Sequence, residues 1–366
     1  MSLPLNKIIQ GDCVNVLNSL PEGSIDLIFA DPPYNLQLKN ELHRPNMTKV
    51  DAVNDHWDRF DSFETYDQFT ISWLTACKRV LKPSGTIWVI GSYHNIFRVG
   101  TIMQNIGYWI LNDVIWVKTN PMPNFRGVRF TNAHETLIWA SKKQGAKYTF
   151  NHKAMKGLNE EKQMRSDWWL ISLATGSERL KDNNGNKAHS TQKPEGLLYR
   201  VILASSNPND IVLDPFFGSG TTGAVAKRLR RNWIGIEKED KYIDIAQKRI
   251  DAVQAELFDE AVFDVRSKSK LAPKVAFSTL LENNYLRPGQ KLFFCKDHNR
   301  TAIIKPDAMI RTLDGFEGSI HRAGGHYMND SPCNGWDNWY IEENGQMIVL
   351  DVIRQHFRID TGLINE

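Results

Sequence analysis

Four consecutive residues, Asp31-Pro32-Pro33-Tyr34, combine the groups in this chain that are best able to do chemistry. They follow the apolar run 25–30, which reads as a buried strand, and ligands of open α/β sheets bind at the carboxyl ends of strands. The Asp31 carboxylate and the Pro32 carbonyl are fixed acceptors, and the Tyr34 ring is a flat stacking surface. This set suits an exocyclic amino group on a planar base. A proline turn that merely follows a strand is the alternative.

Glycines form the second informative pattern. Gly218, Gly220 and Gly223 satisfy G-x-G-x-x-G after the apolar run 211–213 and at the start of a helical pattern. Glu237 ends the next strand-like run, about 20 residues after the first glycine, where a carboxylate can bind the two hydroxyls of an adenosine ribose. The pattern therefore indicates an adenosine-bearing cofactor, which is either a nicotinamide dinucleotide or S-adenosylmethionine.

The neighbours of the glycines favour S-adenosylmethionine. Asp214 directly precedes the loop, where it would repel a pyrophosphate but would suit the cationic amino end of a methionyl group. Phe216 or Phe217 could pack against the cofactor, and the glycines would let the backbone approach it without a Cβ in the way. A plain helix-capping role, with Thr221 or Thr222 as the N-cap, is the alternative.

Length and composition are those of an ordinary globular protein. The 366 residues allow a large α/β core and a smaller second domain. A net charge of +3 gives no overall basic signature, so a nucleic-acid surface must consist of local patches. The 4 cysteines form no CxxC pair, which argues against a zinc site or a disulfide framework and fits a reducing cytosol. With no signal segment and no apolar run near ~18 residues, we expect a cytoplasmic protein without a membrane or metal partner.

The first two-thirds of the chain alternate strand-like and helix-like segments, as an α/β fold with a parallel sheet requires. We expect strands at 7–10, 25–30, 86–90, 109–117, 135–140, 211–213 and 233–237. We expect helices at 65–82, 95–106, 193–206, 221–231 and 239–257. Two polar stretches, 35–62 and 118–190, do not fit this pattern, and they are either functional loops or solvated surface.

The character of the chain changes near residue 260. The segment 261–274 is rich in lysine and arginine and reads as an exposed linker. After it come a short helical pattern at 275–284 and several brief strands separated by glycines. We therefore predict a catalytic domain at 1–260, a basic linker at 261–274 and a small α+β domain at 275–366.

The corner at 31–34, followed much later by the loop at 214–222, resembles the amino-group DNA methyltransferases of the β arrangement, in which the catalytic motif precedes the cofactor loop. Gly11-Asp12 looks like that family's short motif whose acidic residue contacts the cofactor adenine, and Thr191–Pro194 looks like its motif at the methionine end. The resemblance covers roughly residues 5–255 and implies a Rossmann-like S-adenosylmethionine-dependent methyltransferase sheet with the small α+β domain appended. Together these motifs indicate a set of cofactor-binding residues: Asp12, Cys13, Asp31, Lys193, Asp214, Phe216, Gly218, Gly220, Thr221, Thr222 and Glu237.

The resemblance and the corner together predict N6-methylation of adenine. Asp31 and the Pro32 carbonyl would accept the two N6 hydrogens, and Tyr34 would stack on an adenine flipped out of the duplex. N4-methylation of cytosine uses the same geometry, usually with Ser at the first corner position, and is the alternative within the family. A DNA-binding regulator without activity and an NAD-dependent oxidoreductase are the alternatives outside it.

The whole chain looks closer still to the cell-cycle-regulated adenine methyltransferases of α-proteobacteria, which modify GANTC. The segment Leu42-His43-Arg44-Pro45 carries this resemblance, as do 318–321 and 334–336 in the appended domain. It implies double-stranded DNA as the partner, a homodimer, and a place at the nucleoid. A restriction-modification methyltransferase of the same or a related site is the alternative, because such enzymes share the site and much of the sequence.

We expect the loops 35–62 and 118–190 and the appended domain 275–366 to contact DNA and to read its sequence. The candidates combine hydrogen-bonding groups with a stacking ring, since Asn can pair with adenine and Arg with guanine or phosphate. They are Leu42, His43, Arg44, Ser319, His321, Arg322, Asn334 and Trp336. For Trp336 the alternative is a place in the core of the small domain. The pair His134-Glu135 is too isolated to indicate a metal, and we interpret it as structural or loosely associated with the active site.

Overall fold

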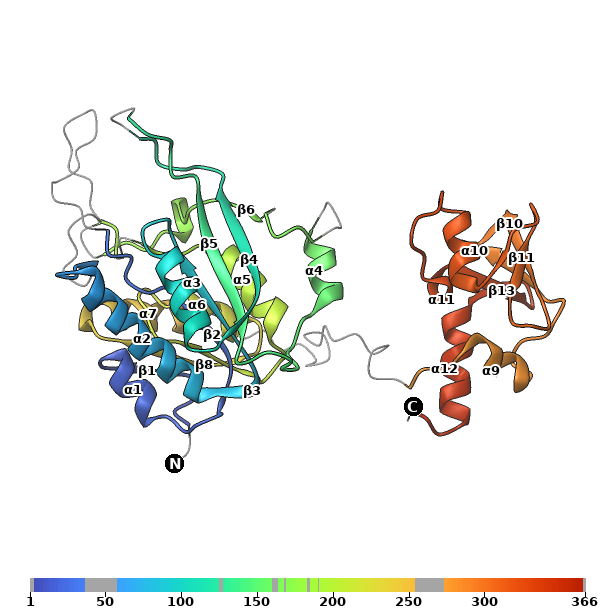
Figure 1. Cartoon of the computed structure of the whole chain (residues 1–366), viewed down its shortest axis with the longest axis horizontal. Coiled ribbons are helices and arrows are strands. Elements are labelled where there is room, and N and C mark those ends of the chain that lie inside the picture. The colour runs from blue at the N-terminus through green and yellow to red at the C-terminus, as the bar shows by residue number, and fades with distance from the viewer. Residues whose placement is uncertain are drawn as a thin grey trace. The chain divides into compact units, whose positions relative to one another are not determined.

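The computed structural model describes residues 3–36, 58–124, 128–159, 164–167, 169–182, 185–189, 191–253 and 273–364. The chain divides into two compact units, Met1–Arg266 and Ser267–Glu366, which are drawn in Figure 1. The division falls within the predicted linker 261–274, of which residues 261–272 lie outside the described ranges.

One sheet of eight strands forms the larger unit, in the order β1-β8-β7-β2-β3-β5-β4-β6. The first five neighbours are parallel: β1 (Lys7–Gln10), β8 (Asn232–Glu237), β7 (Ile211–Asp214), β2 (Ile25–Ala30) and β3 (Leu81–Gly91). The other three strands are β5 (His134–Ser141), β4 (Trp109–Lys118) and β6 (Trp169–Ile171). β5 is antiparallel to its neighbours β3 and β4, and β6 is parallel to β4. The predicted α/β class is confirmed, with an antiparallel end that the strand–helix alternation did not indicate.

Helices cover both faces of this sheet. Figure 1 shows one group on the near side, α1 (Cys13–Ser19), α2 (Phe63–Val80) and α3 (Ile96–Asn105). The helices on the other side are α4 (His152–Leu158), α5 (Glu195–Ser205), α6 (Thr221–Arg228) and α7 (Asp240–Asp251). Alternate residues of β2 enter the two cores, because side chains of a strand point to opposite faces. Ile28 packs in the core with Trp73 of α2, and Phe29 packs in the core with Val201 of α5.

The start of β3 differs from the prediction. Helix α2 ends at Val80, and the strand begins at once, whereas the sequence predicted a helix to 82 and a strand from 86. The register shows why, since Ile25 pairs with Leu81 while Leu27 pairs with Thr86. The residues between Leu81 and Thr86 therefore interrupt the regular pairing of β3 with β2. Gly85 makes this possible, because a Cβ there would lie 2.9 Å from the Ile25 carbonyl oxygen.

Within the described part of the larger unit, three short elements were not predicted, namely α1, α4 and β6. In α1 only Cys13 and Leu17 are buried, which is too few apolar positions to show a helical period. A single 3-10 turn at Gly176–Glu178 also falls in the stretch predicted as loop. Helix α7 ends at Asp251, and residues 254–257 of the helix predicted at 239–257 lie outside the described residues.

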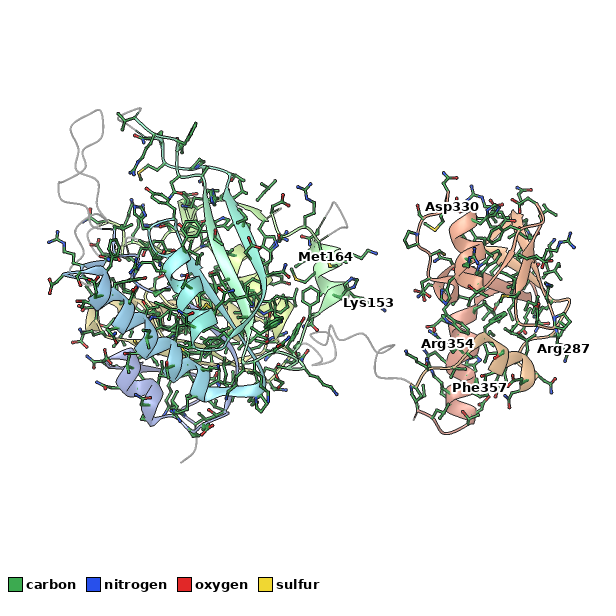
Figure 2. All side chains as sticks on the ribbon, in the orientation of Figure 1. Lys153, Met164, Arg287, Asp330, Arg354 and Phe357 are labelled. Atoms are coloured by element: carbon green, nitrogen blue, oxygen red, sulfur yellow. The ribbon has the colours of Figure 1, made fainter. Side chains whose placement is uncertain are left out.

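An antiparallel sheet packed against helices forms the smaller unit, as the predicted α+β class requires. The strand order is β12-β11-β10-β9-β13-β14. The strands are β9 (Lys291–Phe294), β10 (Asp297–Ile304), β11 (Ile310–Thr312), β12 (Glu317–Gly318), β13 (Trp339–Glu343) and β14 (Gln346–Val349). The helices are α9 (Phe277–Glu282), α10 (Ile320–His326), α11 (Gly335–Asn338) and α12 (Leu350–Asp360). Phe294, Trp339 and Phe357 belong to its separate core, and Figure 2 shows Phe357 extending from α12.

No helix in the described ranges is long and apolar enough to cross a membrane.

Candidate active site

The carboxyl ends of the parallel strands meet at a topological switch point. β2 and β7 are neighbours in the sheet, but the helices that follow them, α2 and α6, lie on opposite faces. Ligands of open α/β folds bind at such a point. A cavity of about 420 Å³ opens there, and its lining includes Asp12, Asp31, Phe216, Gly218 and Glu237. The two sequence patterns, the corner and the glycine loop, therefore face one cavity.

Asp31 presents its two carboxylate oxygens to different surroundings. Oδ2 lies 2.6 Å from Nζ of Lys193, at the start of α5. Oδ1 is buried and has no hydrogen-bond partner among the described residues. Burial raises the pKa of Asp31, and the charge of Lys193 opposes this rise. Oδ1 is thus a buried acceptor without a partner, and leaving such an atom unpaired is costly.

Lys193 was predicted to bind the cofactor, yet the structure makes it the ion-pair partner of Asp31. Its side chain is not among those that line the cavity. Burial alone would lower the pKa of Lys193, but the carboxylates of Asp31 and Glu135 outweigh burial and raise it. Its ammonium therefore stays charged, and it holds one oxygen of Asp31 in place.

Tyr34 is held at both its backbone and its hydroxyl. The hydroxyl donates to Oε2 of Glu135 at 2.9 Å, and Nζ of Lys193 lies 5.2 Å from the ring centroid. The carboxylate of Asp58 accepts the backbone N–H groups of Tyr34 and Asn35. The corner is therefore a fixed structure built from distant parts of the chain and not an isolated proline turn.

The glycine loop uses its glycines mainly for packing against protein. Gly220, with φ of +75°, is itself the N-cap of α6, so the alternative in which Thr221 or Thr222 caps this helix does not hold. A Cβ at Gly220 would lie 2.8 Å from Cβ of Ala246, and a Cβ at Gly223 would lie 2.6 Å from the Phe217 ring. Of the three glycines in the pattern, only Gly218 is among the residues that line the cavity.

Asp214, Thr221 and Thr222 stabilise this loop through hydrogen bonds within the protein. Thr222 donates its hydroxyl to Oδ2 of Asp214 at 2.6 Å, and the Phe216 N–H donates to Oδ1 at 2.9 Å. The Thr221 hydroxyl accepts from Nη1 of Arg249 at 2.7 Å. All three side chains were predicted to bind the cofactor, but their polar atoms serve the protein, and none is in the cavity lining.

The burial of Asp214 predicts a pH dependence of stability. Its pKa rises from 3.8 to about 7, chiefly because of burial and against its bonds from Thr222 and Phe216. The folded protein therefore holds this proton more tightly than the unfolded chain does. The stabilising contribution is complete below pH 3.8 and is lost as the pH rises toward 7. In Asp214→Asn this loss should vanish, so the free energy of unfolding should fall less between pH 4 and pH 8 than in the wild-type protein. Urea denaturation at several pH values checks this, and equal pH slopes would contradict it.

Glu237 ends β8, and Asp12 follows the neighbouring strand β1. Glu237 accepts N–H bonds from Gly218 at 2.7 Å, from Lys238 at 2.8 Å and from Glu239 at 2.9 Å. A carboxylate offers about four acceptor sites, so one remains for a ligand hydroxyl where the sequence predicted two bonds. Asp12 caps α1 by accepting from the Asn15 N–H at 3.1 Å. Both side chains still line the cavity.

Cys13 also lines the cavity, as a thiol and not a thiolate. Burial, together with the charge of Asp12, raises the pKa of Cys13 to about 12. A nucleophilic role is therefore excluded near neutral pH.

Aromatic side chains that sequence reasoning missed complete the lining. His189 and Tyr242 lie side by side with ring centroids 4.4 Å apart, and Phe60 and Phe69 lie 5.3 Å apart. All four line the cavity. Burial, with the charges of Lys193 and Arg179, lowers the pKa of His189 to about 3, so its ring is neutral. These residues belong to no local motif, and only the fold brings them to one place.

The side chains proposed to read DNA in the smaller unit mostly have structural partners. Ser319 caps α10 by accepting from the Arg322 N–H, and Asn334 caps α11 by accepting from the Trp336 N–H. His321 accepts the N–H of Gly335 at 3.0 Å. Trp336 is only 7% exposed, so the core alternative holds for its ring, whereas Arg322 is exposed. Leu42, His43 and Arg44 lie outside the described residues.

In the part of the chain that the structure describes, no group of three or more His, Cys, Asp or Glu side chains could hold a metal ion.

Comparison with known proteins gives a consistent result. A family model described as "DNA methylase" matches residues 25–248. The type II methyltransferase M.HinfI of Haemophilus influenzae is 54% identical over 353 residues, which are 96% of this chain and 97% of that protein. The type II methyltransferase M2.DpnII of Streptococcus pneumoniae is 44% identical over 246 residues, which are 67% of this chain and 89% of that protein. The structure of the PvuII DNA methyltransferase (cytosine-N4-specific) covers 70% of this chain and 89% of its own at a TM-score of 0.51. Its 22% identity supports the fold alone.

Proposed function

Because this chain belongs to the DNA methylase family, we propose that it is a sequence-specific DNA methyltransferase that moves a methyl group from S-adenosylmethionine to N6 of adenine. The observation that carries the proposal is the vacant acceptor Oδ1 of Asp31, buried at the switch point beside the cavity. An exocyclic amino group is a donor that satisfies it.

Asp31 activates the amino group by accepting its hydrogen. The N6 lone pair of adenine is delocalised into the ring, which makes it a poor nucleophile. Acceptance by Asp31 Oδ1 and by the Pro32 carbonyl draws N6 toward a tetrahedral geometry, and Lys193 keeps the carboxylate from turning away. The proton that N6 sheds after transfer passes to Asp31, whose pKa burial raises toward that task.

The base must leave the duplex to reach this corner, since N6 is inaccessible inside a helix. The Tyr34 ring is oriented by its bond to Glu135 and offers the flipped adenine a stacking surface. We assign the catalytic role to Asp31, Pro32 and Tyr34.

The cavity suits S-adenosylmethionine. Its volume lies within the range of small-molecule sites. Asp12 and Glu237 supply acceptors for adenosine, and Phe216 supplies an apolar wall. When bound, the cofactor provides an electrophilic methyl group on sulfur. A thermal-shift comparison tests this choice: S-adenosylmethionine should raise the melting temperature and NAD should not, and the reverse result would favour the oxidoreductase alternative.

Two adjacent phenylalanines offer a matched pair for the cofactor wall. Phe216 lines the cavity, with its ring 5.3 Å from that of Trp73, whereas Phe217 is buried and stacks on Trp233 at 5.5 Å. Phe216→Ala should weaken S-adenosylmethionine binding about tenfold. Phe217→Ala should lower the free energy of unfolding by about 3–5 kcal/mol, because it leaves a cavity in the core. Calorimetric titration and urea denaturation of both variants check this. Equal effects of the two on cofactor affinity would contradict the assignment.

Adenine is favoured over cytosine by the aspartate at the first corner position, where the resemblance places Ser in N4-cytosine enzymes. GANTC is the proposed site, on the resemblance carried by 42–45 and the appended domain. The names of the two curated relatives, both type II methyltransferases, support a restriction-modification role over a cell-cycle role. A homodimer on double-stranded DNA at the nucleoid remains a prediction of the resemblance.

A further inference from the structure

Glu135 is a buried carboxylate outside the catalytic and cofactor motifs, and the sequence indicated only a structural or loosely associated role for the pair His134-Glu135. It is the second residue of β5, in the antiparallel part of the sheet, and it is 8% exposed. Trp116 of β4 pairs with it across the hairpin. Lys118, two residues farther along β4, points to the same side of the strand as Trp116, as the 5.6 Å between its Nζ and the Trp116 ring shows. The hairpin thus delivers one carboxylate and one ammonium to the edge where Asp31 lies.

Glu135 contacts the catalytic corner through one oxygen and a lysine of β4 through the other. Oε2 accepts the Tyr34 hydroxyl at 2.9 Å and lies 3.9 Å from Nζ of Lys193. Oε1 lies 2.9 Å from Nζ of Lys118. Burial alone would raise the pKa of Glu135, but the charges of Lys193 and Lys118 outweigh burial and lower it. The network holds two ammonium groups and two carboxylates, counting Asp31, so its formal charges balance without solvent.

We propose that Glu135 is a positioning residue for methyl transfer, which fixes the Tyr34 ring and keeps Lys193 against Asp31. This inference rests on the proposed function, since it concerns the same site. Glu135 reaches the substrate only through these two partners.

The physical reason is that Glu135 adds a contact that restricts both the Tyr34 ring and the Lys193 ammonium. A buried tyrosine hydroxyl needs an acceptor, and the one that Glu135 supplies sets the angle of the stacking surface. Lys193 stands between Asp31 and Glu135, so the second carboxylate limits where its ammonium can lie. Buried polar networks of this kind are strongly coupled, because each unpaired member costs much in a low dielectric.

The test is Glu135→Gln, which keeps the shape and an acceptor for Tyr34 but removes the charge. We expect kcat to fall about ten- to a hundredfold, as for other small displacements of reacting groups. Affinity for S-adenosylmethionine and KM for DNA should change less than about twofold, because Glu135 is not in the cavity lining. Glu135→Asp, which restores the charge on a shorter side chain, should recover part of the loss.

The pH profile of kcat separates positioning from a structural role. The titratable groups around Lys193 are Asp31, Glu135, Asp214 and the neutral His189, and Lys118 faces Glu135 from β4. The charge of Glu135 raises the pKa of both Asp31 and Lys193. Removal of this charge should therefore lower the pKa of both groups. The acid limb of the profile, set by Asp31, and the alkaline limb, set by Lys193, should both move to lower pH. Tyr34→Phe keeps both charges but loses a hydroxyl that lowers the pKa of Asp31, so its acid limb should move to higher pH, opposite in direction to that of Glu135→Gln.

Asp26→Asn is the matched control. Asp26 lies on β2, the strand that Asp31 directly follows, and pairs with Lys82 at 2.7 Å. Its variant loses a partly buried ion pair far from the cavity, so its kcat and pH profile should stay at wild-type values. If Glu135→Gln keeps wild-type kcat, or loses activity with unmoved limbs, the inference is overturned. If the wild-type protein itself transfers no methyl group to DNA, the proposed function has failed, which is a distinct result.

Discussion

Replacing Asp31 with alanine is expected to reduce methyl transfer by roughly 10³-fold or more, because it removes the acceptor that activates the amino group. Binding of S-adenosylmethionine should stay measurable, since Glu237 and Phe216 of the cavity wall are unchanged. Single-turnover transfer of a labelled methyl group to DNA gives the first quantity, and calorimetric titration gives the second. Substantial residual transfer would remove Asp31 from the catalytic role.

Asp31→Ala should also lower the stability of the protein, and this effect must be separated from the loss of catalysis. Lys193 would lose its closest carboxylate, and breaking a buried ion pair costs about 3–5 kcal/mol of stability. Asp31→Asn keeps the shape and one acceptor oxygen, so it should fall between alanine and the wild-type protein in transfer rate. Asp26→Asn, near the start of β2, serves as the control for lost charge.

Deletion of the chain after Arg266 should abolish sequence-specific methylation while leaving cofactor binding intact. Both hydrophobic cores of the larger unit are built from residues up to Val253, so the catalytic unit keeps its packing. If the smaller unit supplies the sequence-specific contacts, affinity for the recognition site should fall to the non-specific level, at least about 10³-fold. Competition binding with matched and unmatched duplexes measures this.

Full sequence-specific activity in the shortened protein would refute a DNA-reading role for the smaller unit. A point variant narrows the test, because Arg322 is exposed and was predicted to contact DNA. Arg322→Ala should weaken DNA binding, whereas Arg287→Ala, an exposed arginine near α9 in the same unit, should not (Figure 2).

Local patterns were enough to find the corner and the glycine loop. Each motif lies at the carboxyl end of a strand, and the carboxyl ends of parallel strands meet at one edge of the sheet. The sequence could therefore predict that Asp31 and Glu237 lie at the same site. The roles of their neighbours were less visible. Thr222 and Asp214 are eight residues apart, yet nothing in their spacing shows that they bond to each other and not to a ligand.

The network behind the corner could not be read from sequence. Asp31 and Lys193 are 162 residues apart, and Tyr34 and Glu135 are 101 apart. Glu135 reaches Tyr34 because β5 pairs antiparallel with β3, which the strand–helix alternation does not reveal. Trp336 was instead predicted to contact DNA, whereas its ring is buried in the core of the smaller unit. Phe277 packs near its ring, and Arg354 covers it at 4.2 Å.

The central claim is adenine-N6 methylation of a defined DNA site, and methylation-sensitive sequencing tests it most directly. DNA from cells that express the protein, with DNA from cells expressing Asp31→Ala as the control, reports the base, the position and the site together. The account predicts N6-methyladenine at GANTC in the first sample and none in the second. N4-methylcytosine, or unmodified DNA in both samples, would contradict it.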